Sequence, residues 1–109
     1  MRRLILTILC LSLLAGPVPE PTKYVALTFD DGPSGRYTRR LLDGLEARNV
    51  KATFLLCGYR VQQYPEETNR MLREGHEVGC HGFSHKKMDN MSRRDIGAEI
   101  GDTLALLPE

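Results

Sequence analysis

Three short apolar runs along the chain alternate with longer segments whose apolar residues follow helical spacing. The runs Tyr24–Asp30 and Ala52–Leu56 are almost wholly apolar and rich in β-branched and aromatic residues, a pattern typical of strands buried in a parallel sheet. A third, shorter strand is expected at Glu77–Cys80. The Gly and Pro residues at positions 32–35 end the first run and indicate a turn.

Each predicted strand is followed by a predicted helix. Helices are expected at residues 38–48, 65–75 and 92–107, where Leu, Ile and Met recur at helical spacing. Ser92 and Asp95 match the capping box that opens a helix. The alternation of strands and helices predicts an α/β fold with parallel strands joined by right-handed crossovers.

The N-terminal 22 residues form a separate segment. Two arginines precede the apolar run Leu4–Gly16, which is too short to cross a bilayer comfortably as a helix. This pattern predicts a secretory signal peptide or an N-terminal anchor at residues 1–16, followed by a Pro-rich spacer at residues 17–22. We expect residues 23–109 to form the domain outside the cytoplasm, secreted or anchored at the cell envelope, with membrane contact only through an uncleaved N-terminal segment.

Charge and cysteine content narrow the function classes. The formal net charge is +1, from 15 basic and 14 acidic residues, which argues against a nucleic-acid partner. Without Arg2 and Arg3, which leave with the signal, 13 basic residues face 14 acidic ones, a net charge of −1. Cys57 and Cys80 then remain and either pair or stay free, free buried thiols being the commoner outcome. Because no C-x-x-C motif occurs, a thiol-ligated zinc site is disfavoured.

Candidate chemistry collects where the predicted strands end. Asp30 and Asp31 follow the first strand, Cys57 follows the second, and Cys80 and His81 close the third. The carboxyl ends of parallel strands share one edge of the sheet, and active sites of α/β folds gather there. We therefore expect these residues to contribute to one functional site.

Asp30 and Asp31 are adjacent carboxylates just before a Gly-Pro turn. Neighbouring side chains of a strand point to opposite faces, but the turn can direct both toward one cavity. Because close carboxylates repel, one is expected to be paired or metal-bound while the other titrates at higher pH. That division suits a metal ligand beside a general base; a solvated Asp-Gly turn is the alternative.

His81 and His85 lie four residues apart. On a helical turn this spacing places both imidazoles on one side, within reach of one ion; two unrelated surface histidines are the alternative. His76 has no partner at this spacing, and we expect it to be structural. With Asp31, the two histidines form a two-histidine, one-carboxylate set, which leaves coordination positions open as catalytic metal sites do.

These motifs together resemble a known family. The chain is similar to the polysaccharide deacetylases of carbohydrate esterase family 4 in its TFDDGP motif, Thr28–Pro33, and in its HGFSH motif, His81–His85, as well as in ATFLLCG and EGHEVGCHGFSH. The resemblance runs from Tyr24 to about Leu107. It implies the N-terminal part of a distorted (β/α) barrel, and a hydrolase that removes acetyl groups from N-acetylated sugars of chitin-like polymers or cell-wall peptidoglycan, or O-acetyl groups from xylan. The implied partner is an acetylated polysaccharide or oligosaccharide.

The resemblance also implies roles for individual residues. Asp30 corresponds to the catalytic general base that activates water. Asp31, His81 and His85 correspond to the ligands of a divalent metal ion, for which zinc is expected, while cobalt, nickel and iron also suit this ligand set.

Three features depart from the family pattern. Gly82 stands where Ser or Thr is usual, so the hydroxyl at that position is missing, and Cys80 stands where Asn is frequent. The family's later motifs, with an arginine and a general-acid histidine, do not occur in this sequence. We therefore expect a truncated enzyme with little deacetylase activity. A non-catalytic metal- or glycan-binding remnant is the alternative, whereas a phosphotransferase is disfavoured because D-x-D is absent after Asp30.

Overall fold

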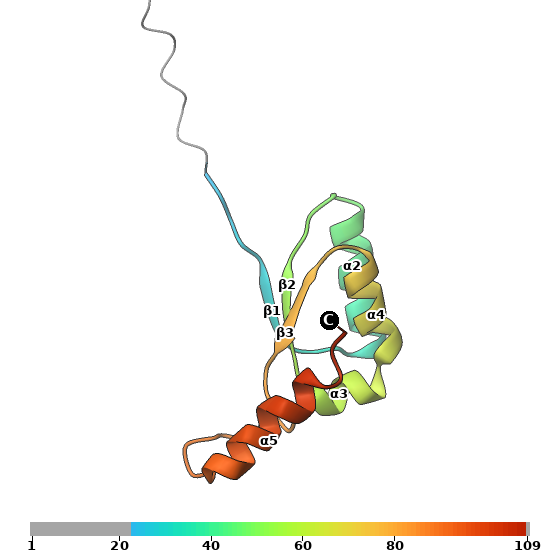
Figure 1. The fold of residues 1–109 in the computed structure, drawn as a ribbon. Helices are drawn as coiled ribbons and strands as arrows, with labels where there is room; N and C mark the ends of the chain where they lie inside the picture. Colours follow the sequence, from blue (N-terminus) through green and yellow to red (C-terminus); the bar gives the residue numbers. More distant parts are fainter. Residues whose placement is uncertain (1–22, 109) are drawn as a thin grey trace, which may run out of the picture.

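A three-stranded parallel sheet organises residues 23–108, the part of the chain that the computed structural model describes. Its strands are β1 (Thr28–Gly32), β2 (Thr53–Leu56) and β3 (Glu77–Cys80). β2 lies in the middle and pairs in parallel with both neighbours (Figure 1). The α/β prediction is thus confirmed, while the expected signal segment and spacer, residues 1–22, lie outside the described residues.

Helices pack on one side and at one end of this sheet. They are α2 (Gly35–Glu46), α3 (Gly58–Gln63), α4 (Pro65–Arg73) and α5 (Arg93–Leu104). Helices α2 and α4 lie side by side, whereas α3 and α5 lie beyond the carboxyl ends of the strands (Figure 1). No helix between residues 23 and 108 has the length and apolar character needed to cross a membrane.

The predicted helix start at Ser92 is confirmed, and the Ser92 side chain caps α5. The Ser92 hydroxyl accepts a hydrogen bond from the Asp95 N–H at 3.2 Å, and it donates to the Asp95 carboxylate at 2.7 Å. This cap satisfies an N–H group that the first helical turn would otherwise leave unpaired. Helix α5 therefore begins at a fixed point after the loop that follows β3.

The core lies between the sheet and helices α2 and α4. Phe54 and Leu56 alternate along β2 with Thr53 and Leu55, and only the first pair is buried, as expected for side chains that alternate across a strand. The other members of the core cluster come from the helices and from the residue before β2, namely Leu42, Leu45, Ala52, Val61 and Met71. This apolar layer anchors β2 and thereby the strand ends beside it.

The prediction of a buried strand at Tyr24–Asp30 is wrong in both extent and burial. The strand begins only at Thr28, and Tyr24 and Val25 are 87% and 86% exposed. β1 is an edge strand of the described sheet, so β2 covers only one of its sides. Phe29 alone links β1 to the core, with its ring 5.4 Å from the Phe54 ring.

A bulge interrupts β1 at its carboxyl end. Asp30 lies opposite Leu55 and Gly32 lies opposite Leu56, so Asp31 is an extra residue without a partner on β2. Its φ is +69°, in the left-handed region, where Asp is among the residues tolerated. Such bulges bend a strand and redirect a side chain, and this one contains Asp31, a residue of the functional site.

Candidate metal centre

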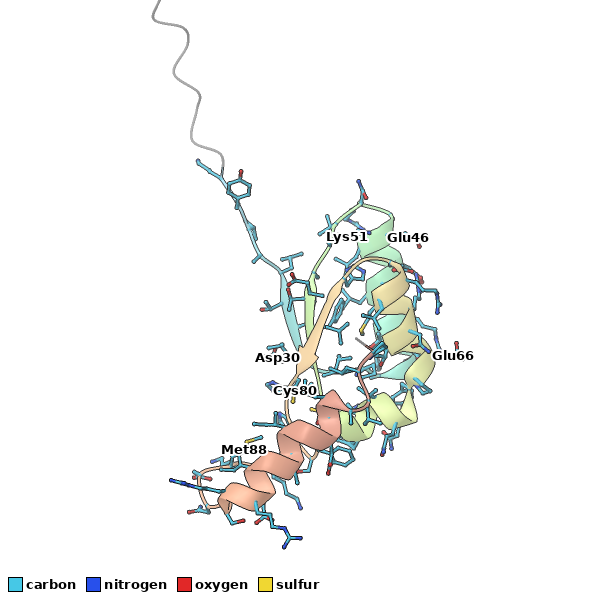
Figure 2. All side chains as sticks on the ribbon, viewed as in Figure 1. Asp30, Glu46, Lys51, Glu66, Cys80 and Met88 are labelled. Carbon is cyan, nitrogen blue, oxygen red and sulfur yellow. The ribbon has the colours of Figure 1, made fainter. Side chains whose placement is uncertain are left out.

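Three side chains from opposite edges of the sheet converge beyond its carboxyl end. Asp31 Oδ1 lies 3.1 Å from His81 Nε2 and 2.9 Å from His85 Nε2, and one ligand atom from each residue lies within 4.8 Å of the others. The structure thus brings together the three residues that the sequence proposed as metal ligands. Figure 2 labels Asp30 and Cys80, the neighbours of these residues, at this same end of the sheet.

The bulge in β1 explains how two adjacent carboxylates come to share one cavity. Asp30 and Asp31 both line an open depression of about 500 Å³, together with Tyr37 and Arg60. A regular strand would send the two side chains to opposite faces. From the sequence, the Gly-Pro turn was expected to direct both side chains toward one cavity, whereas in the structure the strand becomes irregular one residue earlier, at Asp31.

The histidines are brought together by a turn that is not helical, so the predicted helical turn is wrong. His81 extends the ladder of β3, donating its N–H to the Leu56 carbonyl at 2.8 Å. The chain then reverses through Gly82 and His85, whose φ values are +82° and +59°. We call residues 81–85 the histidine turn; its two imidazole centres lie 5.4 Å apart.

The histidine turn is held from both sides. The Gly58 and Tyr59 N–H groups, at the start of α3, donate to the carbonyls of Gly82 and Phe83 at 3.0 and 3.1 Å. From α5, the Glu99 carboxylate accepts the N–H groups of Phe83 and Ser84. Sequence reasoning missed Glu99, since a glutamate in an exposed helix carries no signal of its own.

The donor set and its spacing fit a divalent ion. Ligand atoms about 2.1 Å from one ion, at angles of about 90–109°, lie about 3.0–3.4 Å apart, close to the separations of Asp31 from His81 and His85. The side chains are 31–59% exposed, so an ion has access from solvent. The histidines line a second depression of about 560 Å³, which also contains Lys86 and Lys87.

His76 is structural, as the sequence predicts. Its side chain is 1% exposed, and its Nδ1 accepts a hydrogen bond from the Ala52 N–H at 3.2 Å. Burial is the main cause that lowers the pKa of His76 below its usual value, with the positive charge of Lys51 acting in the same direction. The imidazole therefore remains neutral at neutral pH and cannot serve as a cationic group of the site.

Cys57 and Cys80 are both free thiols. Cys57 is fully buried, and burial raises the pKa of its thiol. Cys80 Sγ accepts a hydrogen bond from the Gly82 N–H at 3.3 Å. This contact directs the thiol into its own backbone turn, and Cys80 does not belong to the ligand cluster.

Comparison with known proteins identifies relatives across nearly the whole domain. A family model described as polysaccharide deacetylase matches residues 18–108. The chain is 47% identical over 81 residues to the peptidoglycan-N-acetylmuramic acid deacetylase PdaC of Bacillus subtilis, covering 74% of this chain and 17% of that protein. It is 41% identical over 85 residues to a peptidoglycan-N-acetylglucosamine deacetylase of Bacillus cereus, covering 78% of this chain and 40% of the relative.

Solved structures show the same likeness. The structure of PdaC from Bacillus subtilis superimposes with a TM-score of 0.73 and 46% identity, over 74% of this chain and 40% of that one. A family 4 acetyl xylan esterase from Clostridium thermocellum, in complex with a cobalt ion, gives a TM-score of 0.71 and 48% identity, again over 74% and 40%. These matches confirm the predicted fold, part of a (β/α) barrel. The chain spans less than half the length of each of these relatives.

Proposed function

The chain belongs to the polysaccharide deacetylase family, and we propose that it carries the metal-binding part of a hydrolase that removes acetyl groups from N-acetylated sugars of peptidoglycan. The observation that carries this proposal is the convergence of Asp31, His81 and His85 at the carboxyl end of the sheet. Two relatives named as peptidoglycan deacetylases support the choice of polymer. The acetyl xylan esterase among the structural neighbours makes an O-acetylated xylan the second substrate to test.

Zinc is the ion that we propose for the three ligands. Two imidazoles and one carboxylate suit Zn²⁺ and leave coordination positions free for water and substrate. A bound divalent ion supplies Lewis acidity toward the acetyl carbonyl and toward water. One structural neighbour was solved in complex with a cobalt ion, so Co²⁺ is a suitable second probe for this chain.

Asp30 is the general base that we propose. It lines the same depression as Asp31, and its side chain accepts no hydrogen bond from residues 23–108. A carboxylate without such a partner is free to take the proton from a water molecule as that water attacks the acetyl carbon. The neighbouring Asp31 carboxylate contacts both histidines. We therefore assign metal binding to Asp31 and proton transfer to Asp30.

Export fits this function. Peptidoglycan lies outside the cytoplasm, and we infer that residues 1–16 direct the domain there as a signal peptide or anchor. The apolar run and the arginines before it support this inference. Secretion of a reporter enzyme fused after Pro21 tests it, and a reporter retained in the cytoplasm would contradict it.

Metal binding by the full chain tests the proposed centre directly. We expect Zn²⁺ and Co²⁺ to bind with one ion per chain in calorimetric titrations, and we expect His81→Ala and His85→Ala to weaken binding by at least about 100-fold. The matched control is Asp89→Asn, which removes an exposed carboxylate from the same loop and should leave the affinity unchanged. Equal affinity in the wild type and both histidine variants would exclude the centre.

Acetate release then separates the possible activities. The metal-loaded chain is incubated with an N-acetylglucosamine oligomer, with peptidoglycan and with O-acetylated xylan, and Asp30→Asn serves as the variant without the base. Metal-dependent acetate release from the amide substrates alone supports the proposed function. Little acetate release is expected from the sequence, so weak or absent release would agree with that expectation, whereas release from O-acetylated xylan alone would favour the second substrate.

A further inference from the structure

We propose that Glu99 is a positioning residue of the metal centre, which fixes the histidine turn, and thereby the spacing of His81 and His85, from helix α5. The inference rests on the proposed metal-binding role of the two histidines. Glu99 makes no hydrogen bond to either imidazole among the described residues. Glu99 therefore acts on the backbone between the two histidines.

Both carboxylate oxygens of Glu99 bind the middle of the histidine turn. Oε2 accepts the N–H groups of Phe83 and Ser84 at 2.8 and 2.7 Å, and Oε1 accepts the Ser84 hydroxyl. An ionised carboxylate is an acceptor only, so three donors from two adjacent residues match its capacity. Hydrogen bonds to a charged acceptor are about twice as strong as neutral ones, so these contacts are expected to hold the turn more strongly than the neutral backbone bonds from α3 do.

The anchor adds to the hydrogen bonds that α3 makes to the turn. The Gly82 and Phe83 carbonyls accept N–H groups at the start of α3, and the Phe83 and Ser84 N–H groups are bound only by Glu99 among residues 23–108. Backbone N–H groups left unpaired in a partly buried turn are unfavourable. Removing the carboxylate therefore loosens the turn at the two residues that lie between the histidines.

The turn also needs an external anchor because its backbone is strained. His85 has a φ of +59°, a conformation that a residue with a side chain adopts only where its surroundings hold it. Ser84, which precedes it, is bound to Glu99 through both its N–H and its hydroxyl. The family pattern has its hydroxyl at the position of Gly82. The Ser84 hydroxyl lies two residues later, and it donates to Glu99 on α5.

Glu99 is itself fixed in place. The Thr103 hydroxyl, on a fully buried side chain, donates to the Glu99 carbonyl at 2.8 Å. At Gly58 a Cβ atom would lie 2.4 Å from Phe83 and 2.8 Å from Thr103, so α3, α5 and the turn are in close contact there. The hydrogen bond from the Ser84 hydroxyl lowers the pKa of Glu99, which keeps the carboxylate ionised at neutral pH.

The test compares Glu99→Gln and Glu99→Ala with Asp102→Asn, which removes an exposed carboxylate from the same helix. Co²⁺ affinity is measured on the full chain, and amide hydrogen exchange is measured by NMR without metal. We expect Glu99→Ala to weaken Co²⁺ binding by about 10–100-fold, the range found for residues that orient metal ligands. Glu99→Gln, which keeps the shape and loses the charge, should give a smaller loss, and Asp102→Asn should bind as the wild type does.

The metal-free measurement reports the turn itself. Exchange at the Phe83 and Ser84 amides should become at least about 10-fold faster in the Glu99 variants, while the Phe54 amide in β2 keeps its wild-type rate. If Glu99→Ala does not fold, Glu99→Gln and Ser84→Ala decide the outcome with the same two readouts. If the folded variants keep both the Co²⁺ affinity and the exchange rates of the wild type, the role of Glu99 is excluded while the proposed function stands. If the wild type itself binds no Co²⁺, both the proposed function and the role of Glu99 are excluded.

Discussion

Gly82 connects the conformation of a single residue to the geometry of the metal centre. Its φ is +82°, and a Cβ atom there would lie 3.1 Å from Met88 Cε and 3.4 Å from Glu99 Oε2. We predict that Gly82→Ala lowers the free energy of unfolding by about 1–2 kcal/mol, because the left-handed conformation is unfavourable for any residue with a Cβ. Urea denaturation of the metal-free chain measures the loss.

The matched control for that substitution is Gly97→Ala on α5. A Cβ at Gly97 has no atom within 4 Å, and alanine is favoured over glycine in a helix by about 0.8–1.0 kcal/mol. We therefore expect this variant to be as stable as the wild type or more so. Equal losses at Gly82 and Gly97 would mean that the histidine turn does not require its left-handed residue.

His76 gives the domain a pH dependence of defined sign. Burial, with a smaller effect of Lys51, lowers the pKa of the folded imidazole, and Glu74 only partly opposes this. As the pH falls below about 6.5, the unfolded chain binds a proton at His76 that the folded chain does not bind. The free energy of unfolding contributed by His76 is therefore complete above about pH 6.5 and declines as the pH falls toward the lower folded pKa.

Denaturation of the wild type and of His76→Gln at about pH 7.5 and about pH 5.5 measures this contribution. Glutamine is uncharged at both values, so His76→Gln should lose less stability between them than the wild type. His81 and His85 are present in both proteins, so their contributions cancel in the comparison. An equal decrease in the two proteins would show that His76 does not contribute.

At the scale of elements, an ion pair joins helices α2 and α4 beside the core. Arg39 Nη1 donates to Glu67 Oε1, and the Glu67 side chain is 4% exposed, whereas that of Arg39 is 59% exposed. We predict that Arg39→Ala destabilises the domain by about 1–3 kcal/mol, because it leaves a buried carboxylate without its partner. The exposure of Arg39 keeps the expected loss below that of a fully buried pair.

Arg40→Ala provides the control on the same helix. Arg40 is exposed and makes no hydrogen bond or ion pair within residues 23–108, so its removal should change stability by no more than about 0.5 kcal/mol. Thermal and urea denaturation of both variants measure the difference. Equal stability of the two variants would show that water replaces the guanidinium at Glu67.

The sequence predicted elements where local signals agree with tertiary packing. The span of β3, Glu77–Cys80, is as predicted, and the Ser92 cap sets the start of α5. Helix α3 was not predicted, because six residues are too few to show helical periodicity. The apolar residues at Tyr24 and Val25 suggested a buried strand, but burial depends on what packs against a strand, and a single-strand pattern does not contain that information.

At the scale of the whole molecule, residue types and strand ends predicted which side chains meet, but not how. Adjacent aspartates and two spaced histidines sufficed to propose Asp31, His81 and His85. The bulge at Asp31 could not be predicted from the sequence, because it depends on the register between β1 and β2. The left-handed conformation of His85 could not be predicted either, because it depends on contacts from α3 and α5. Glu99 was hidden for the same reason, since its partners lie 15 and 16 residues away.

The central position of β2 has a thermodynamic consequence for the chain. Asp31 lies at the carboxyl end of one edge strand, and His81 and His85 follow the other, so a shared ion would cross-link the sheet across β2 and close a loop of about 50 residues. Such binding adds about 2.7 kcal/mol of stability when the free ion is at 100 times its dissociation constant. We expect Zn²⁺ to raise the melting temperature of the wild type and not of His81→Ala; equal melting with Zn²⁺ and with a chelator would contradict this. The concentration of free metal where the chain folds would then determine what fraction of the chain stays folded and is protected from proteolysis.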